Sequence, residues 1–535
     1  MAEGTPTGGV VAPSSESEQP GTARDLAVPV PAHVEARTGD PFVIGPGVRV
    51  VTDGSTEAVA VAVMAASRLH RLSDVPVAVL HEDDGTPGSV VLALADAATV
   101  GVPAGTDASL AHEAYRIDVT ADRAVLTAVS GAGLLHAAHT LQQCAVPGAE
   151  PATWTVAPQL VVDHPRFAWR GLCLDVARHF FGVPDLLRVL DLMASLKLNV
   201  LHLHLTDDQG WRLDVPSRPA LAAVSGLTAV GGDPGGYYSS QDWAQLLGYA
   251  ASRHVTVVPE IDLPGHVNAA LHALGELTPS GRPARAYTGI DVGFSRLHVD
   301  LPATRPFLHD VLGDVAAMTP GPWVHVGGDE VLTMEPAEYR ALVRAAVEEL
   351  AAAGKTVVGW QEVASALDGP PAPGEGPALE EALASAVVQY WDEREGAEEV
   401  TRAAAHGARV VLSPATRVYL DMRYDAATPV GLEWAGHVEV RDSYEWEPLD
   451  VLPGVPADRV LGVEAALWTE TVRTSEDLFL LLLPRLAAVA EVAWSRADAR
   501  GWDSFAARLP RQTARWDERG YTWYRSPQVP WSAGR

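Results

Sequence analysis

Two adjacent acids, Asp329 and Glu330, follow a Gly-Gly pair at the end of a short apolar segment. The preceding Trp323-Val-His-Val alternates in a way that favours a β-strand, and the two glycines favour a sharp bend. A strand that delivers carboxylates through such a bend is typical of the catalytic rim of an α/β barrel. The alternative is an acidic helix N-terminus after a strand, because Asp and Glu favour the first helical turn. The other strand ends of the chain decide between these two interpretations.

Polar and aromatic residues recur where other predicted strands end. The polar residues are Arg178, Asp207, His266, Asp421 and Glu470, and the aromatic residues are Trp360, Trp391, Tyr419, Trp434 and Trp468. Aromatic faces stack on the C–H surfaces of pyranose rings, and carboxylates and arginine bind hydroxyl groups directionally. An arginine, several acids and several tryptophans on one rim therefore indicate a sugar-binding site.

Each of these residues also has a purely structural interpretation. Arg178 could pair with Asp175 or Asp207 in an ion pair that only holds the fold together. Any single tryptophan is more often packed between helices, although three at equivalent strand ends favour a site. His266 follows Pro-Gly and could be a helix-capping or surface histidine.

The elements that must position these residues alternate as strands and helices from His164 almost to the end of the chain. Strands are predicted at 171–177, 200–206, 255–261, 323–327, 356–361, 386–391, 409–412 and 460–467. Helices are predicted at 184–197, 240–253, 336–353 and 476–493. Eight strand–helix units predict a (β/α)8 barrel, an α/β fold. The long inserts at 280–297 and 418–453 follow strand ends and should lie on the catalytic rim.

The chain of 535 residues is too long for one ordinary domain. Residues 1–38 are rich in Gly, Pro, Ser, Thr and Glu and are predicted to be a disordered tail. Residues 39–162 are predicted to form a small α+β domain, which shows nothing catalytic. The barrel is predicted to span 163–524, with a loose tail at 525–535.

The formal net charge of −29 argues against nucleic acid and anionic membrane surfaces as partners, because both would repel the chain. The sequence contains no run of about 18 apolar residues, so no membrane span is predicted. The N-terminus lacks the pattern of a secretory signal. A cytoplasmic location is therefore expected, with export by another route left open. Cys144 and Cys173 are the only cysteines, which fits a reducing compartment, although a single bridge between them stays open.

His202 and His204 suggest a different class of protein. Two histidines spaced by two on a strand share one face, and such a pair in a barrel can bind Zn²⁺. Both positions lie within the predicted strand and below the rim, which favours a packed, hydrogen-bonded role. No metal and no organic cofactor is expected.

The strand-end motifs taken together are highly specific. They read DDQGWR at 207–212, PEIDLPGH at 259–266 and HVGGDE at 325–330, followed by GWQE, YWD, YLD and ALWTE. From His164 to Trp494 the chain closely resembles glycoside hydrolase family 20, the β-N-acetylhexosaminidases. The first domain resembles the family's N-terminal α+β domain more loosely, because an aromatic residue is more usual near His136.

This resemblance implies exo-acting, retaining hydrolysis of terminal β-linked N-acetylglucosamine or N-acetylgalactosamine from glycans or chitooligosaccharides. An ordinary retaining glycosidase holds two carboxyl groups about 5–5.5 Å apart, and an inverting one about 6.5–9.5 Å apart, on opposite sides of the bond. Neighbouring Asp329 and Glu330 do not suit that arrangement. Substrate assistance does, because the 2-acetamido oxygen of the substrate itself attacks the anomeric carbon and forms an oxazolinium intermediate.

The resemblance also implies a role for each matching residue. Glu330 would be the general acid and later the base for water, and Asp329 would accept the acetamido N–H. Tyr419 would donate its hydroxyl to the acetamido oxygen, while Asp207 and His266 would set the protonation and placement of Glu330. Substrate binding would fall to Arg178, Asp421 and Glu470 for hydroxyl groups, to Trp360, Trp391 and Trp468 as aromatic walls, and to Trp434 on the later rim.

Two alternatives stay open beside this hypothesis. One is a related exo-glycosidase that releases a disaccharide, in the manner of a lacto-N-biosidase. The other is a catalytically silent glycan-binding barrel, which would need neither a proton donor nor an acetamido-orienting acid. The preference between gluco and galacto forms and the oligomeric state are not indicated by the sequence.

Overall fold

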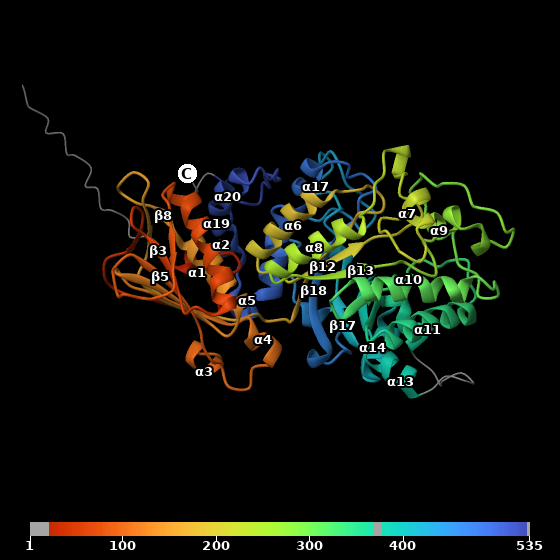
Figure 1. Cartoon of the computed structure of the whole chain (residues 1–535), viewed down its shortest axis with the longest axis horizontal. Helices are drawn as coiled ribbons and strands as arrows, with labels where there is room; N and C mark the ends of the chain where they lie inside the picture. Colours follow the sequence, from red (N-terminus) through yellow and green to blue (C-terminus); the bar gives the residue numbers. More distant parts are fainter. Residues whose placement is uncertain (1–20, 368–376, 532–535) are drawn as a thin grey trace, which may run out of the picture.

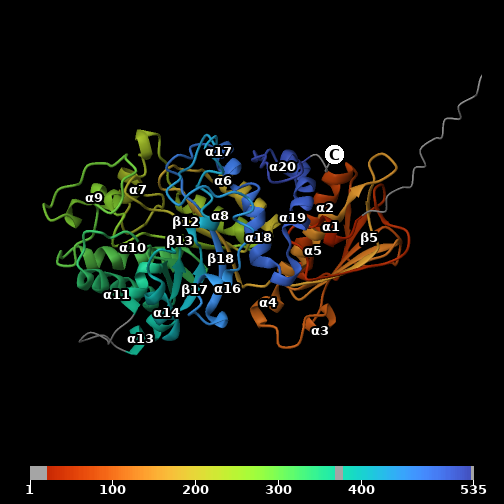
Figure 2. The same cartoon turned by 180° about the vertical axis from the view of Figure 1, so that it is seen from behind.

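The computed structural model describes residues 21–367 and 377–531, which form a small first domain beside a large barrel (Figure 1). The chain passes from the first domain into the barrel and then returns. Its last helices, α19 (Trp502–Arg508) and α20 (Thr513–Glu518), lie between the two parts in both views (Figures 1 and 2). The C-terminal segment is therefore part of the seam between the domains.

The barrel is a closed ring of eight parallel strands, as predicted. They are β11 (Trp169–Asp175), β12 (Val200–His204), β13 (Thr256–Glu260), β14 (Trp323–His325), β15 (Thr356–Trp360), β16 (Val387–Tyr390), β17 (Arg409–Leu412) and β18 (Val460–Leu467). The ring closes because β11 pairs with β18 as well as with β12. The strands read as short apolar runs because both of their faces are covered.

Amphipathic helices cover the outside of the ring. They include α6 (Val183–Ser195), α8 (Ser240–Ser252), α10 (Thr304–Met318), α11 (Pro336–Ala352) and α14 (Ala397–Ala405). On α6 the buried residues recur every three or four positions, at Leu186, Val189, Leu190 and Met193, which places one stripe against the strands.

Two connections differ from the predicted pattern. The helix predicted at 476–493 is two helices, α17 (Ser475–Leu482) and α18 (Arg485–Trp494), because Pro484 lacks the N–H that a continuous helix needs. The connection from β17 to β18 has no long helix and contains the short helices α15 (Ala415–Val418) and α16 (Pro448–Val451) and the 3-10 turn η4 (Ala457–Arg459). This connection is instead a long loop over the rim, as expected for the insert at 418–453.

The first domain is an α+β unit, which confirms the prediction for its class. Its seven-stranded sheet has the order β1 (His33–Ala36), β10 (Gln159–Asp163), β6 (Tyr115–Val119), β7 (Arg123–Ala128), β5 (Ser89–Leu94), β3 (Arg49–Thr52) and β4 (Ala78–Leu80). A separate small sheet joins β2 (Phe42–Ile44), β9 (Trp154–Val156) and β8 (Val146–Pro147). Helices α2 (Thr56–Ser73) and α5 (Gly131–Cys144) pack together and share the apolar core of the domain.

The prediction of a disordered tail over residues 1–38 is wrong for its second half. Residues 1–20 lie outside the described part of the chain, but 21–38 contain α1 (Ala23–Leu26) and β1. The backbone N–H of Val30 donates to Glu491 on α18, and Ala27 accepts from Arg508 on α19. Buried apolar residues on this segment therefore anchor it between the first domain and the end of the barrel.

The predicted C-terminal tail at 525–535 is also wrong in part. Ser526 is fully buried and its hydroxyl donates to Glu439, while the indole N–H of Trp531 donates to the Ser526 carbonyl. Residues 525–531 thus pack against the barrel, and 532–535 lie outside the described residues.

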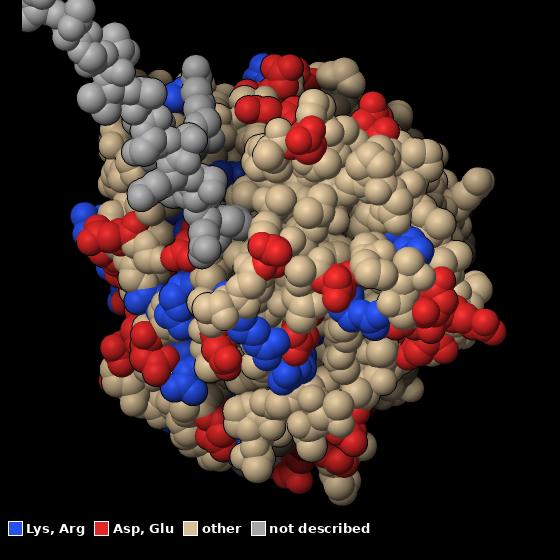
Figure 3. Space-filling model, turned by 90° about the vertical axis from the view of Figure 1, so that its left-hand side faces the viewer, with Lys and Arg blue, Asp and Glu red and all other residues tan. Residues whose placement is uncertain are grey.

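Acidic and basic side chains are interspersed over the first-domain end of the molecule, so the negative charge is not gathered there in one patch (Figure 3). None of the helices described is both long and apolar enough to cross a bilayer. Cys144 and Cys173 are separate buried thiols rather than a bridge, and burial raises the pKa of each to about 12.

Candidate active site

A cavity of about 270 Å³ opens at the carboxyl ends of the barrel strands. Its walls are formed by Arg178, Ile290, Val292, Asp329, Glu330, Trp391, Arg394, Tyr419, Leu432, Trp434, Trp468 and Glu470. Eight of the twelve site residues predicted from the sequence are among them. The other four, Asp207, His266, Trp360 and Asp421, are buried around these walls.

The acid pair reaches the cavity through the glycine bend after β14. Gly327 has φ +66°, and a Cβ on it would lie 1.8 Å from the Asp262 carboxylate. Only glycine allows the two loops to approach this closely. Glu330 itself has φ +51°, a left-handed conformation that costs a residue other than glycine about 1–3 kcal/mol and is common at functional sites. No helix begins here, since α11 starts at Pro336, so the helix N-terminus interpretation of the acids is wrong.

Both acids face the same nitrogen of one histidine. His266 Nε2 lies 3.5 Å from a Glu330 oxygen and 3.8 Å from an Asp329 oxygen. The histidine is buried at the end of the β13 loop and is neither a helix cap nor a surface residue. The two carboxylates are therefore on the same side of the cavity.

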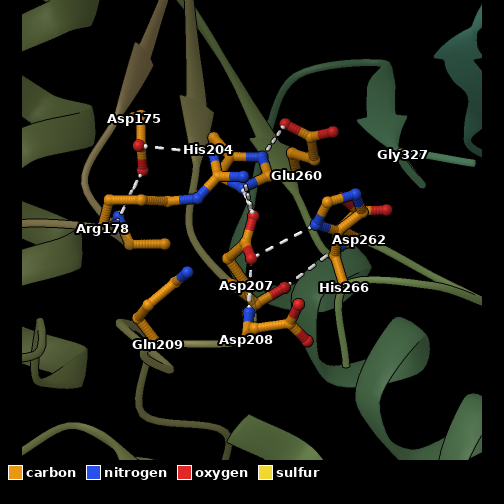
Figure 4. A network of polar contacts seen from close by, with 12 residues as sticks. Asp175, Arg178, His204, Asp207, Asp208, Gln209, Glu260, Asp262, His266 and Gly327 are labelled. Carbon is orange, nitrogen blue, oxygen red and sulfur yellow. Dashed lines mark hydrogen bonds and ion pairs between the residues drawn. The ribbon is translucent and has the colours of Figure 1, made fainter. Parts of the chain in front are cut away.

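Asp207 connects this histidine to the rest of the rim (Figure 4). One of its oxygens is 3.3 Å from His266 Nδ1, and the other is 2.7 Å from Arg178 Nη2 and 2.9 Å from His204 Nε2. Arg178 also reaches Asp175 at 3.4 Å. The arginine thus makes the structural ion pairs left open by the sequence, and it lines the cavity as well.

The charges in this network stabilise one another. Burial would raise the pKa of Asp207, but Arg178 and His266 hold it well below its ordinary value. Burial would lower the pKa of His266, but Asp207, Asp262 and Asp329 raise it well above the ordinary range. The pair is therefore a carboxylate and an imidazolium whose second N–H points at the two acids.

The carboxyl groups of Asp329, Asp262 and Glu362 are less fully balanced by nearby positive charge. Burial, opposed by His266 and reinforced by Glu330, raises the pKa of Asp329 to about 6. Burial and Asp329 together raise the pKa of Asp262 well above its ordinary value and that of Glu362 to about 8. Glu362 accepts the indole N–H of Trp391 at 3.3 Å. Perturbed carboxyl groups clustered in and around one cavity are typical of a catalytic site.

A second polar layer lies beneath, inside the ring of strands. Glu260 is 2.6 Å from His204 Nδ1 and 3.0 Å from His202 Nε2, while His202 Nδ1 is 2.9 Å from Glu464. Cys173, Glu260 and Glu464 overcome burial and raise the pKa of His202 well above its ordinary value, and Glu260 and Asp207 raise that of His204 to about 10.

This layer brings potential metal ligands together, among them Cys173, His202 and Glu260. Both ring nitrogens of His202 and of His204 already lie 2.6 to 3.0 Å from carboxylate oxygens of the protein. The donor set therefore fits a hydrogen-bonded barrel interior better than a zinc site, in line with the interpretation of His202 and His204 favoured by the sequence.

Aromatic side chains form the opposite part of the cavity. Trp391 and Tyr419 lie parallel with ring centroids 6.1 Å apart, and Trp434 stands across both. Trp468 lies 5.7 Å from Trp360, which is buried beneath and donates its indole N–H to Glu260. Trp434 is the exposed member at the mouth, with 45% of its surface accessible.

Two further acids belong to the site: Glu470 lines the cavity and Asp421 is buried near it. Burial and the neighbouring Glu470 raise the pKa of Asp421 well above its ordinary value, and burial raises that of Glu470 although Arg178 opposes it. Both oxygens of Asp421 and one of Glu470 are buried without a hydrogen-bond partner in the described protein. Such acceptors suit ligand hydroxyl groups.

Sequence reasoning missed four residues of the cavity wall. Ile290 and Val292 come from the insert at 280–297, which was expected on the rim, but nothing in its composition singles them out. Leu432 and Arg394 belong to the later loops, and Arg394 pairs with Asp392 at 2.7 Å.

Comparison with known proteins gives a consistent result over the whole chain. The model for the catalytic domain of glycosyl hydrolase family 20 matches residues 167–497, and the model for domain 2 of that family matches residues 27–164. A beta-N-acetylhexosaminidase of Cellulomonas fimi is 52% identical over 508 residues, which cover 95% of this chain and 97% of that protein.

Solved structures agree in fold as well as in sequence. The GH20 beta-N-acetylhexosaminidase of Streptomyces coelicolor A3(2) matches with a TM-score of 0.86 at 42% identity, covering 96% of this chain and 100% of that one. The Streptomyces plicatus enzyme, solved with its product GlcNAc, matches with the same TM-score at 44% identity, covering 95% and 98%. With the acid pair, the barrel and the first domain all in place, the chain belongs to glycosyl hydrolase family 20 and is a glycoside hydrolase.

Proposed function

We propose that this chain is an exo-acting β-N-acetylhexosaminidase that removes terminal β-linked N-acetylglucosamine, and N-acetylgalactosamine, from glycans or chitooligosaccharides. The observation that carries this proposal is the shared histidine of the acid pair. Asp329 and Glu330 are adjacent in the chain and lie near the same imidazole nitrogen, an arrangement that favours one side of a sugar over two opposite faces. A nucleophile must therefore come from elsewhere, and the 2-acetamido oxygen of the substrate supplies it.

The acid pair then divides the work. Glu330 donates a proton to the glycosidic oxygen and later takes one from the attacking water. Asp329 has one buried oxygen without a hydrogen-bond partner in the described protein, and this oxygen accepts the acetamido N–H. As the acetamido oxygen attacks the anomeric carbon, positive charge develops on the oxazolinium ring and the Asp329 carboxylate stabilises it.

Tyr419 also binds the acetamido group, at its oxygen. Burial and neighbouring acids raise its pKa well above the ordinary value, so the phenol keeps the proton that it donates to the acetamido oxygen. Trp391 and Trp468 wall the group from the sides, and Trp360 supports them from beneath. Water reaches the anomeric carbon only after the leaving group departs through the open mouth.

The size of the cavity supports release of a single sugar. About 270 Å³ falls below the roughly 300–1,000 Å³ typical of drug-sized ligands, and Arg178 and Glu470 occupy its walls. A disaccharide-releasing enzyme needs room for a second ring beyond this end. A silent glycan-binding barrel would not need Asp329 at a raised pKa beside a proton donor.

Three chromogenic substrates test the proposal side by side: nitrophenyl β-N-acetylglucosaminide, the corresponding galactosaminide and a nitrophenyl lacto-N-bioside. Hydrolysis of the monosaccharide glycosides with retained configuration is expected. Turnover of the disaccharide alone would support the lacto-N-biosidase alternative, and no turnover at all would support the binding-only alternative. Activity lost to a chelator and restored by Zn²⁺ would overturn the substrate-assisted scheme.

A further inference from the structure

A second, enclosed cavity of about 50 Å³ lies where the first domain, the barrel and the C-terminal helices meet. Its walls come from α2 and α5 of the first domain, from α6 of the barrel and from the α20 region. Helices α2, α5 and α20 gather at this seam in both views (Figures 1 and 2). One water needs about 10–15 Å³, so the space suits a small polyatomic ion. It shares no residue with the substrate cavity.

Arg68 on α2 is the most unusual residue of this cavity. Only 6% of it is exposed, and its Nη2 lies 3.0 Å from His139 Nε2. Its Nε and Nη1 are buried without any hydrogen-bond partner in the part of the chain that the structure describes. Burial beside Arg71 lowers its pKa to about 9, so the guanidinium is still charged at neutral pH. Buried arginines are rare unless paired, because removing a charge from water is costly.

His139 cannot supply the missing counter-charge. Burial, together with Arg68, lowers its pKa well below the ordinary value, so it is a neutral acceptor of one Arg68 N–H. Arg515 repeats the pattern on the opposite wall. Its Nη2 donates to the Gln142 carbonyl at 2.7 Å, but its Nε is buried without a partner.

The remaining charges leave the cavity positive. Arg71 and Arg519 also line it, against the two carboxylates of Asp191 and Glu518. Asp191 is already 3.0 Å from Arg519 and 3.1 Å from Arg253, and Glu518 is 3.8 Å from Arg71. Neither acid pairs with Arg68 or Arg515. A chain with a net charge of −29 thus concentrates guanidinium groups around one enclosed space.

We propose that this cavity binds one small oxyanion, with inorganic phosphate or sulfate as the free form, between Arg68 and Arg515. Guanidinium N–H groups donate charge-assisted hydrogen bonds to such oxygens, and the unpartnered Nε and Nη1 of Arg68 and Nε of Arg515 are the donors left for them. The anion neutralises a positive cluster built by three distant parts of the sequence, and so fastens the first domain and the C-terminal helices to the barrel. Arg71 and Arg519, each about one-third exposed, form its entrance.

The test is a titration of the full chain with sodium phosphate while sodium chloride keeps the ionic strength constant. A saturable rise in Tm of about 2–3 °C is expected at a concentration of ~100 Kd. Isothermal titration calorimetry should give one phosphate per chain. Parallel titrations with sulfate and with acetate distinguish a tetrahedral oxyanion from a carboxylate ligand.

Arg68→Met keeps the length of the side chain and removes the charge. It should abolish both the saturable rise in Tm and the heat of binding, while kcat/KM stays unchanged. In phosphate-free buffer its Tm should equal or exceed that of the wild type, because an unpaired buried charge is gone. The control Arg305→Met, an exposed position on α10, should keep the full response and so reveal any general salting effect of phosphate.

A wild type that binds no phosphate or sulfate calorimetrically would overturn the proposal. So would an Arg68→Met variant that responds to phosphate as the wild type does. Should that variant fail to fold, Arg515→Met and the calorimetry of the wild type carry the same decision.

Discussion

The two halves of the barrel rim use different chemistry. The half that follows β11 to β14 is ionic and supplies Arg178, Asp207, His266 and the acid pair, connected by contacts of 2.7 to 3.8 Å. The half that follows β15 to β18 is mainly aromatic and supplies the four tryptophans and Tyr419. In this half, burial raises the pKa of Glu362, Asp421 and Glu470, whereas Arg178 and His266 lower the pKa of Asp207 in the other half.

The ionic half of the rim is suited to proton transfer, and the aromatic half is suited to binding the sugar ring. A proton donor needs fixed charges around it, because its strength depends on the field at its carboxyl group. A sugar ring needs apolar faces and neutral acceptors that bind it without strong charge. Changes in the acid pair should therefore lower kcat, and changes in the tryptophans of the aromatic half should mainly raise KM.

The largest effect is expected for Glu330→Gln. This change removes the proton donor and should lower kcat/KM about 10²- to 10⁴-fold on a substrate whose leaving group needs protonation. The loss should shrink on a dinitrophenyl glycoside, whose leaving group departs without help. Steady-state kinetics on both substrates measure the loss of kcat/KM. Glu348→Gln, at an exposed position, is the matched control. A near wild-type rate on the first substrate would contradict the acid assignment.

The second-largest loss of activity is expected for Asp329→Asn. The amide keeps the shape but loses the charge that stabilises the developing oxazolinium, and kcat should fall about 10²- to 10³-fold. Affinity for a thiazoline mimic of the intermediate should fall with it. Asp291→Asn, an exposed acid of the nearby loop, serves as the control. Unchanged kcat together with intact thiazoline affinity would remove Asp329 from the mechanism.

The pH profile sharpens the same comparison. Asp329 must be ionised to hold the acetamido N–H, and its pKa is about 6. The ionised fraction falls as pH drops through this value, so kcat/KM should decline about tenfold per pH unit below it. In Asp329→Asn, whose side chain cannot ionise, this limb should disappear from the residual activity. An acid limb that stays in place in the variant would show that another group controls it.

The smallest effect is expected in the aromatic half. Trp391→Leu removes one parallel face of the cavity, and the lost aromatic contact of about 0.5–1.5 kcal/mol should raise KM roughly 2- to 10-fold. Trp434→Leu, at the exposed mouth, should change KM less. A fall in kcat as large as that of Asp329→Asn would break the division between the two halves.

The sequence predicts the barrel and most of the site because both depend on local patterns. Apolar runs followed by Asp207, His266, Asp329 and Trp360 mark strand ends, and parallel strands bring those ends together. The break at Pro484 was missed, although proline interrupts a helix. The cytoplasmic location stays a prediction.

The features that could not be predicted depend on contacts between distant segments. Residues 21–38 have the composition of a tail, and partners far along the chain, such as Gln143 on α5 and Glu491 on α18, give them order. Ile290 becomes part of the site through the path of a loop that no periodicity describes. Arg68 looks like an exposed position of an amphipathic helix until α20 covers it.

The hydrogen bond from Val30 to Glu491 also sets an order of events during synthesis. The two residues are 461 positions apart, and a ribosome adds about 5–20 residues per second. Val30 therefore leaves the ribosome about 20–90 s before its partner exists. The first domain can form its own hydrophobic core in that interval. The segment around Val30 lacks its partners, however, until α18 and α19 emerge. A segment made early in translation and one made late thus hold the two domains together. A nascent chain that stalls before Arg508 therefore lacks the contacts between them.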